Sequence, residues 1–198
     1  IPSGELTNLP FLMHVAKKGK PILLSTGMGT LEEVREAMDV LKKNGATEIA
    51  VFHCTSEYPT PPADINLRAM QTLADEFGLP TGLSDHSEGI CVAIAAVALG
   101  ACMIEKHFTL DRSLPGPDHK TSLEPGELKE MIRCIRMTEQ SLGSGDKKPT
   151  KGELDTARVA RKSIVARRDI KAGARITGEN IYIVRPGTGI PPKHFNEI

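Results

Sequence analysis

The sequence predicts an α/β fold: the C-terminal half of a (β/α)8 TIM barrel followed by a small, mainly β domain. Three observations in the 198 residues lead to this prediction. Short apolar runs start 24 to 30 residues apart, a segment with helical periodicity follows each run, and a Gly/Ser/Pro/Lys stretch at 141–150 separates the two parts. Repeated βα units require a mainly parallel sheet, either doubly wound or closed as a barrel. A complete barrel needs about 250 residues, so four units correspond to half of one.

Each predicted element has its own basis in the sequence. In the interval between the first two apolar runs, the apolar residues follow the helical spacing: Leu31, Val34, Met38 and Leu41. An earlier helix is predicted at 9–18, and its own strand would precede residue 1. We therefore expect the first four βα units, and the natural start of the chain, to lie before this point. Strands are expected at 21–26, 49–54, 79–86 and 103–109, and helices at 31–44, 66–76, 89–100 and 124–142.

Charge divides the chain near residue 147. Residues 1–149 hold 15 basic and 20 acidic side chains, whereas residues 150–198 hold 10 basic and 5 acidic ones. We predict a partial barrel domain at 1–146, and a linker with a second domain at 147–198. Short strands around one helical turn are expected there at 163–167, 176–181 and 182–187. Such a short segment is near the lower limit for an independent core, so we expect it to be supported by another part or to be truncated.

Composition excludes several classes of protein. The 25 Lys and Arg residues balance 25 Asp and Glu residues, which excludes a polybasic nucleic-acid binder acting through bulk charge. No apolar run approaches the roughly 20 residues that a membrane span needs. The cysteines form no C-x-x-C pair, so we expect reduced thiols in a cytoplasmic protein. Neither nucleic acid nor a membrane is an expected partner.

Three histidines occupy corresponding positions in successive units. His53, His86 and His107 lie at or near the ends of the second, third and fourth predicted strands. In a barrel, these strand ends carry the active site. Imidazoles that converge there are suitable ligands for Mn²⁺ or Mg²⁺ together with oxygen donors, and Asp85 and Glu105 are expected to orient them. The alternative is that each histidine is hydrogen-bonded within the core.

Small hydroxyl residues repeat at the same strand ends. Such residues bind phosphate or carboxylate when they open a βα loop, although they also serve simply as turn formers. Gly27 and Gly29 belong to no complete G-x-G-x-x-G, so nucleotide binding is discounted. The hydroxyl residues concerned are Ser3, Ser25, Thr26, Thr55, Ser56 and Ser84.

The longest unusual loop is predicted at 111–120. Pro115 and Pro117 flank Gly116 and stiffen the backbone, so that Asp118 is presented at the barrel mouth. The loop is suited to binding a polyol, or it is a solvated connection.

Taken together and in order, the motifs resemble the sialic acid synthase family, whose members condense phosphoenolpyruvate with N-acetylmannosamine or a related amino sugar. The resemblance implies the C-terminal half of the barrel followed by the start of an antifreeze-like (SAF) domain. It covers nearly the whole chain. The motifs are Ser3-Gly-Glu5, Ser25-Thr-Gly-Met28, His53-Cys-Thr-Ser-Glu-Tyr-Pro59, Leu83-Ser-Asp-His86, Ile104-Glu-Lys-His-Phe-Thr109, Gly116-Pro-Asp-His119 and Arg185-Pro-Gly187.

The resemblance also implies roles for single residues. His86 and His107 match the ligands of a divalent metal, Mn²⁺ or Mg²⁺. The candidates for catalysis are Glu105, Glu5 and His53. The family's SAF-domain arginine acts in the partner subunit of a domain-swapped homodimer. Residues that match phosphoenolpyruvate contacts are Ser3, Ser25, Ser56 (where relatives have Asn) and Ser84, and those that match sugar contacts are Tyr58, Asp118 and Arg185.

The implied reaction is metal-dependent carbon–carbon bond formation with release of phosphate. Legionaminic or pseudaminic acid synthesis is the alternative, because those relatives share most of the motifs. A second alternative is a Schiff-base aldolase using Lys106, but strand alternation turns Lys106 away from the side that Glu105 and His107 face. A third alternative is a non-catalytic binding module carried by the SAF segment.

Overall fold

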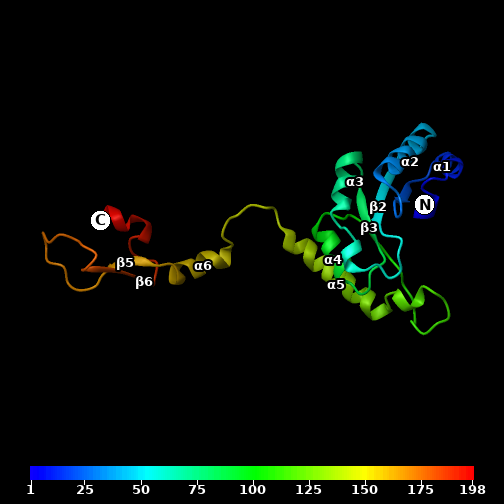
Figure 1. Cartoon of the computed structure of the whole chain (residues 1–198). Coiled ribbons are helices and arrows are strands. Elements are labelled where there is room, and N and C mark those ends of the chain that lie inside the picture. Colours follow the sequence, from blue (N-terminus) through cyan, green and yellow to red (C-terminus); the bar gives the residue numbers. More distant parts are fainter. The chain divides into compact units, whose positions relative to one another are not determined.

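The structure is a computed structural model that describes residues 1–198 and contains two compact units, 1–144 and 145–198 (Figure 1). The first unit is a parallel sheet of four strands in the order β1-β2-β3-β4, each followed by a helix. This confirms the predicted α/β half-barrel. Its elements are α1 (Leu9–Ala16), β1 (Ile22–Ser25), α2 (Leu31–Lys43), β2 (Ile49–Cys54), α3 (Ala69–Phe77), β3 (Thr81–Asp85), α4 (Cys91–Ala98), β4 (Ile104–Lys106) and α5 (Pro125–Leu142).

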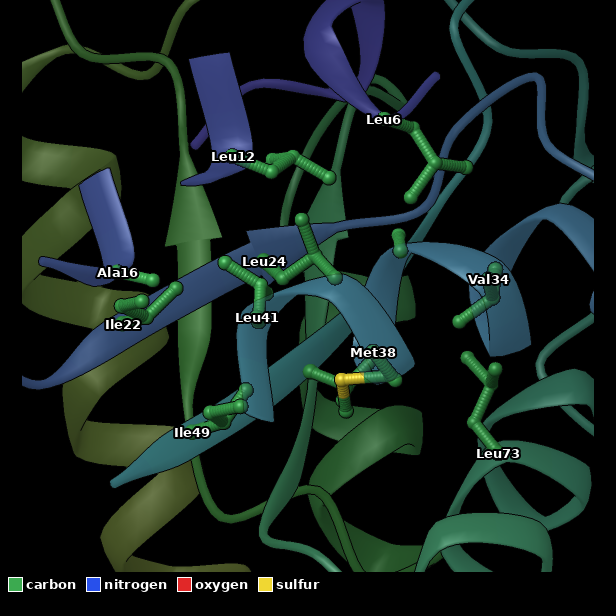
Figure 2. Packing of buried hydrophobic residues seen from close by; sticks show 12 residues of the cluster. Leu6, Leu12, Ala16, Ile22, Leu24, Val34, Met38, Leu41, Ile49 and Leu73 are labelled. Atoms are coloured by element: carbon green, nitrogen blue, oxygen red, sulfur yellow. The ribbon is translucent and has the colours of Figure 1, made fainter. Parts of the chain in front are cut away.

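The hydrophobic core lies between the sheet and its helices. Leu24 on β1 and Leu41 on α2 are fully buried, and Leu12 of α1 packs into the same cluster (Figure 2). The helix α2 starts at a capping box, in which Thr30 and Glu33 bond each other's backbone N–H groups. Burying apolar side chains on this one face fixes the register of the strands.

The opposite face of the sheet carries the hydroxyl and carboxyl groups. Cys54 pairs with Ser84, and Ser84 pairs with Glu105 in the strand register, so these three side chains share the inner face. Ser25 pairs with Phe52 and belongs to the same face. The inner face therefore presents two of the predicted phosphoenolpyruvate contacts, Ser25 and Ser84, and the catalytic candidate Glu105.

The second unit contains α6 (Lys151–Ala160) and an antiparallel pair, β5 (Ser163–Ala166) and β6 (Ile181–Val184), followed by a 3-10 helix η4 (Pro192–Glu197). The predicted strand at 176–181 does not form. The side chain of Asn180 instead accepts from the Thr177 N–H at 2.9 Å and donates to the Arg175 carbonyl at 3.0 Å, which makes this segment a turn. No helix of the chain has the length and apolar character that crossing a membrane requires.

Candidate active site

Two of the three predicted histidines meet at the carboxyl ends of β3 and β4. The ring centroids of His86 and His107 are 5.4 Å apart, and Tyr58 lies against both, at 4.1 Å from His86 and 5.3 Å from His107. We call Tyr58, His86 and His107 the His–Tyr cluster. Its members come from the loop after β2 and from the first positions after β3 and β4, which is where barrels place their active sites.

The tautomer of His86 is fixed by a backbone group. Its Nδ1 lies 2.7 Å from the carbonyl oxygen of Thr55, and because a carbonyl only accepts, Nδ1 carries the proton. The lone pair of Nε2 then faces the site. Burial lowers the pKa of His86, and the nearby His107 lowers it further, so the imidazole is neutral near pH 7. A neutral imidazole with a free Nε2 is the form that binds metals.

Two carboxylates flank the cluster. Glu105 accepts a hydrogen bond from the Ser84 hydroxyl at 2.7 Å, and Ser84 Oγ is 3.4 Å from His86 Nε2. Asp118 Oδ2 lies 4.0 Å from His107 Nδ1. Nitrogen and oxygen donors of this kind suit Mn²⁺ or Mg²⁺. No group of three or more His, Cys, Asp or Glu side chains is arranged as a metal site, so the metal remains a prediction.

Loop 111–120, which carries Asp118, is anchored by Arg112. The Arg112 N–H donates to Glu124 at 3.0 Å, its Nε donates to the Ser122 carbonyl at 2.9 Å, and its guanidinium pairs with Glu127. The contact with Arg112 also lowers the pKa of Glu127. These bonds hold the base of the loop next to the start of α5.

A group of hydroxyls lies where the loops after β1 and β2 meet the first residues of the chain. Ser3 Oγ and Ser56 Oγ are 3.0 Å apart, and the N–H of Gly27 donates to Cys54 Sγ at 3.0 Å. A Cβ on Gly27 would lie 2.3 Å from Ser3 Cβ and 2.4 Å from Ser56 Oγ. We call Ser3, Ser56 and Gly27 the serine cluster. Only glycine permits this close approach of hydroxyls and backbone.

His53 is not brought to the His–Tyr cluster. Its neighbour Cys54 faces inward, so strand alternation turns His53 to the helical face, where Nε2 lies 2.7 Å from the carbonyl oxygen of Ile65. There it lines a cavity of about 380 Å³ with residues of α2 and α3. The expected convergence of three histidines is therefore found for His86 and His107 alone.

Three other predicted residues have different surroundings. Glu5 lies in the 3-10 turn η1 (Ser3–Glu5) and accepts from Asn8 Nδ2 at 2.6 Å. Ser25 is buried, and its N–H donates to the Ile1 carbonyl at 3.0 Å. Arg185 follows β6 in the second unit, where it is exposed.

Asp85 does not orient the histidines by a direct bond to either ring, contrary to expectation, because its carboxylate bonds Ser87 and Lys106. It is the last residue of β3 and faces the helices, where its carboxylate pairs with Lys106 Nζ at 2.8 Å. The Thr55 carbonyl orients His86 instead, and a backbone group of this kind leaves no signal in the sequence. Lys106 lies on the helical side, as alternation predicts, with a side chain only 3% exposed. A buried, paired lysine on that face is badly placed for a Schiff base.

The fold defines a protein with half of a parallel β/α barrel, and the strand-end cluster is its candidate site. The chain belongs to the NeuB family, which it matches over residues 1–147, and residues 161–198 match the SAF domain. This confirms the resemblance that the motifs indicate.

Several named synthases are similar to this chain. The chain is 52% identical to the N,N'-diacetyllegionaminic acid synthases of Legionella pneumophila and Campylobacter jejuni. These matches cover the whole of this chain, 57% of the Legionella protein and 60% of the Campylobacter protein. It is 38% identical to the N-acetylneuraminate-9-phosphate synthase of Mus musculus over 98% of the chain and 54% of that protein. The structure of an N-acetylneuraminic acid synthetase from Leptospira borgpetersenii, 37% identical, superimposes with a TM-score of 0.71, over 78% of this chain and 54% of the other.

Proposed function

We propose that the protein condenses phosphoenolpyruvate with an N-acetylated amino sugar to form a sialic-acid-type product, and that phosphate is released. The observation that carries the proposal is the His–Tyr cluster beside the Ser84–Glu105 pair, at the carboxyl ends of β3 and β4 in a chain of the NeuB family. The chain spans about three fifths of the legionaminic acid synthases that it matches, so the proposal concerns the activity of the whole protein.

A divalent metal, Mn²⁺ or Mg²⁺, is part of the proposal. His86 Nε2 and the imidazole of His107 would hold it, because both rings lie at the strand ends and the His86 tautomer leaves Nε2 free. When bound, such a metal polarises the aldehyde oxygen of the open-chain sugar.

The residues of the chain bind and orient the reactants. Hydroxyl donors are proposed to bind the phosphate and carboxylate of phosphoenolpyruvate, whose methylene carbon forms the new bond to the aldehyde carbon. Water then adds to the former enol carbon, and the bond to phosphate breaks. Glu105, already an acceptor for a hydroxyl, is suited to take a proton of that water and to return it to the former aldehyde oxygen, which becomes a hydroxyl; the remaining proton leaves with the phosphate as the ketone forms. Fixing both reactants supplies much of the rate by proximity. The donors proposed are Ser3, Ser25, Ser56 and Ser84 for phosphoenolpyruvate, and Tyr58 and Asp118 for the sugar.

Three sugars are candidates. N-acetylmannosamine is the simplest, and the sugar precursors of legionaminic acid and of pseudaminic acid are the others. Identity is 52% to the two N,N'-diacetyllegionaminic acid synthases but 39% to a pseudaminic acid synthase and 38% to an N-acetylneuraminate-9-phosphate synthase. These values favour the legionaminic precursor.

We further propose a cytoplasmic homodimer in which Arg185 binds the acetamido group of the sugar in the other subunit. Its guanidinium is exposed at the end of β6, in a unit that is compact on its own. A planar fork of N–H donors suits an amide carbonyl. The four free cysteines fit a reducing compartment.

The experiment is a substrate screen of the whole protein. Purified protein with Mn²⁺ and phosphoenolpyruvate is given each candidate sugar in turn, while phosphate release is measured and the product is identified by mass. We expect phosphate release only when a sugar is present, fastest with the legionaminic precursor. A Glu105→Gln variant, which keeps the size of the side chain, should lose the reaction, whereas Glu36→Gln on the exposed face of α2 should retain it. A folded, Mn²⁺-loaded protein that releases no phosphate with any sugar would contradict the proposal.

A further inference from the structure

A buried ion pair lies on the side of the sheet opposite the site. Asp85 ends β3 and Lys106 ends β4, and the two residues are partners in the strand register. Lys106 Nζ is 2.8 Å from Asp85 Oδ2, with side chains that are 3% and 1% exposed. The pair therefore joins the ends of two neighbouring strands behind the inner face.

The loop after β3 is tied into the same network. Lys106 Nζ also donates to the Ser87 carbonyl at 2.7 Å, while the N–H and the hydroxyl of Ser87 both donate to Asp85 Oδ1, at 2.9 and 2.6 Å. Asp85 and Ser87, the residues immediately before and after His86, both belong to this network. The backbone that carries this histidine is held at the residues before and after it.

Stability alone is a weak reason for such a pair. Removing two charges from water costs about as much as their attraction returns, and a well-packed apolar pair often stabilises a fold equally well. An ion pair instead holds its two side chains in a defined geometry, because a hydrogen bond between charged groups forms only at a narrow range of distances and directions. The pair lies directly behind His86 and His107, and this position indicates which residues the fixed geometry affects.

We propose that the Asp85–Lys106 ion pair positions His86 and His107 for metal binding. Each charged residue immediately precedes one of the histidines, so joining the strand ends behind the sheet fixes the separation of the two rings in front, which have centroids 5.4 Å apart. This inference rests on the proposed function, which assigns the rings to a metal. Asp85 and Lys106 are positioning residues and touch neither metal nor substrate.

The test measures Mn²⁺ affinity, which requires no turnover. The dissociation constant is determined by competition with a fluorescent chelator, in the whole protein and well below its unfolding temperature. Lys106→Met keeps the length of the side chain but removes the charge. We expect it to weaken Mn²⁺ binding by about 10 to 100-fold, the range typical for groups that orient metal ligands. Lys106→Arg, which keeps the charge, should recover part of the affinity.

Control variants separate positioning from general destabilisation. Arg35→Met removes an exposed ion pair of 2.6 Å between α2 and α3, remote from the cluster, and should leave the Mn²⁺ affinity unchanged. Asp85→Asn keeps the shape of the side chain and an acceptor for Ser87, so it serves if Lys106→Met does not fold. In a folded protein it should also weaken Mn²⁺ binding.

The possible results are distinct. A lower unfolding temperature with unchanged Mn²⁺ affinity in both Lys106→Met and Asp85→Asn would show that the pair is structural only, and would overturn the inference while leaving the proposed function intact. Absence of Mn²⁺ binding in the unaltered protein would overturn the metal assignment and the inference with it.

Discussion

Gly27 lies where the loop after β1 meets Ser3 and Ser56, and its replacement by alanine tests the serine cluster. A Cβ at this position would lie 2.3 Å from Ser3 Cβ and 2.4 Å from Ser56 Oγ, far inside normal contact. The backbone φ of +30° is also unfavourable for any residue with a side chain. Gly27→Ala should therefore both destabilise the fold and displace the two hydroxyls.

The size of the effect has two parts. A left-handed backbone costs alanine about 1 to 2 kcal/mol, and forcing an extra methyl group into a packed site costs about 1 to 3 kcal/mol. The sum is about 2 to 5 kcal/mol. Gly78 is the matched control, because its φ is +61° but nothing lies within 4 Å of an added Cβ. Gly78→Ala should lose only the backbone part, about 1 to 2 kcal/mol.

The assay is denaturant unfolding of both variants beside the unaltered protein, together with the KM for phosphoenolpyruvate. Gly27→Ala should be less stable than Gly78→Ala by about 1 to 3 kcal/mol. It should also raise the KM, which Gly78→Ala should not. Equal stabilities of the two variants would refute the steric argument, and an unchanged KM would refute the role of the serine cluster in binding phosphoenolpyruvate.

Three further predictions concern the loop anchored by Arg112, the buried thiol of Cys54 and the proposed dimer. Arg112→Ala should loosen loop 111–120 and raise the KM for the sugar about two- to fivefold, as expected for the loss of a partly exposed ion pair. An unchanged KM in steady-state kinetics would contradict the role of Arg112 in anchoring this loop. Because burial raises the pKa of the Cys54 thiol, it stays protonated at about pH 8, so iodoacetamide should alkylate the exposed Cys91 first, as read by mass spectrometry. Equal rates of labelling at Cys54 and Cys91 would contradict this prediction. Arg185→Ala should raise the KM for the sugar alone roughly 10- to 150-fold, which corresponds to about 1.5 to 3 kcal/mol. At a sugar concentration near the KM of the unaltered protein, Arg185→Ala subunits mixed with His86→Ala subunits should regain activity that neither variant shows on its own. Proven subunit exchange without recovery would place Arg185 in its own chain's site or in none.

The sequence predicts the first unit well because its signals are local and repeated. Every strand from β1 to β4 lies inside its predicted range, and the apolar spacing of α2 is sufficient to define it. The second unit is predicted less well. The helix α6 was missed although Thr150 and Glu153 form a capping box, a pattern visible in the sequence. The strand expected at 176–181 fails because Asn180 bonds backbone groups that a strand would need.

The site shows where residue patterns are insufficient. Alternation predicts the direction of Lys106 because it lies on the same strand as Glu105. For His53, the face follows only from the register that pairs Cys54 with Ser84, and register depends on contacts between strands. The Thr55 carbonyl that orients His86 is a backbone atom, which every residue type has. The residues at the strand ends can therefore be predicted from the sequence, but the groups that each of their side chains contacts can be identified only from the folded structure.

The most direct test of the central claim is the Mn²⁺ dependence of phosphate release in the whole protein with His86→Gln and His53→Gln. Chelation should abolish the reaction and Mn²⁺ should restore it. His53→Gln should saturate at the same Mn²⁺ concentration as the unaltered protein, because His53 faces the helices, whereas His86→Gln should need about 10 to 100-fold more metal or more still. Full activity in excess chelator, or an equal loss of Mn²⁺ affinity in both variants, would contradict the placement of the site at the His–Tyr cluster.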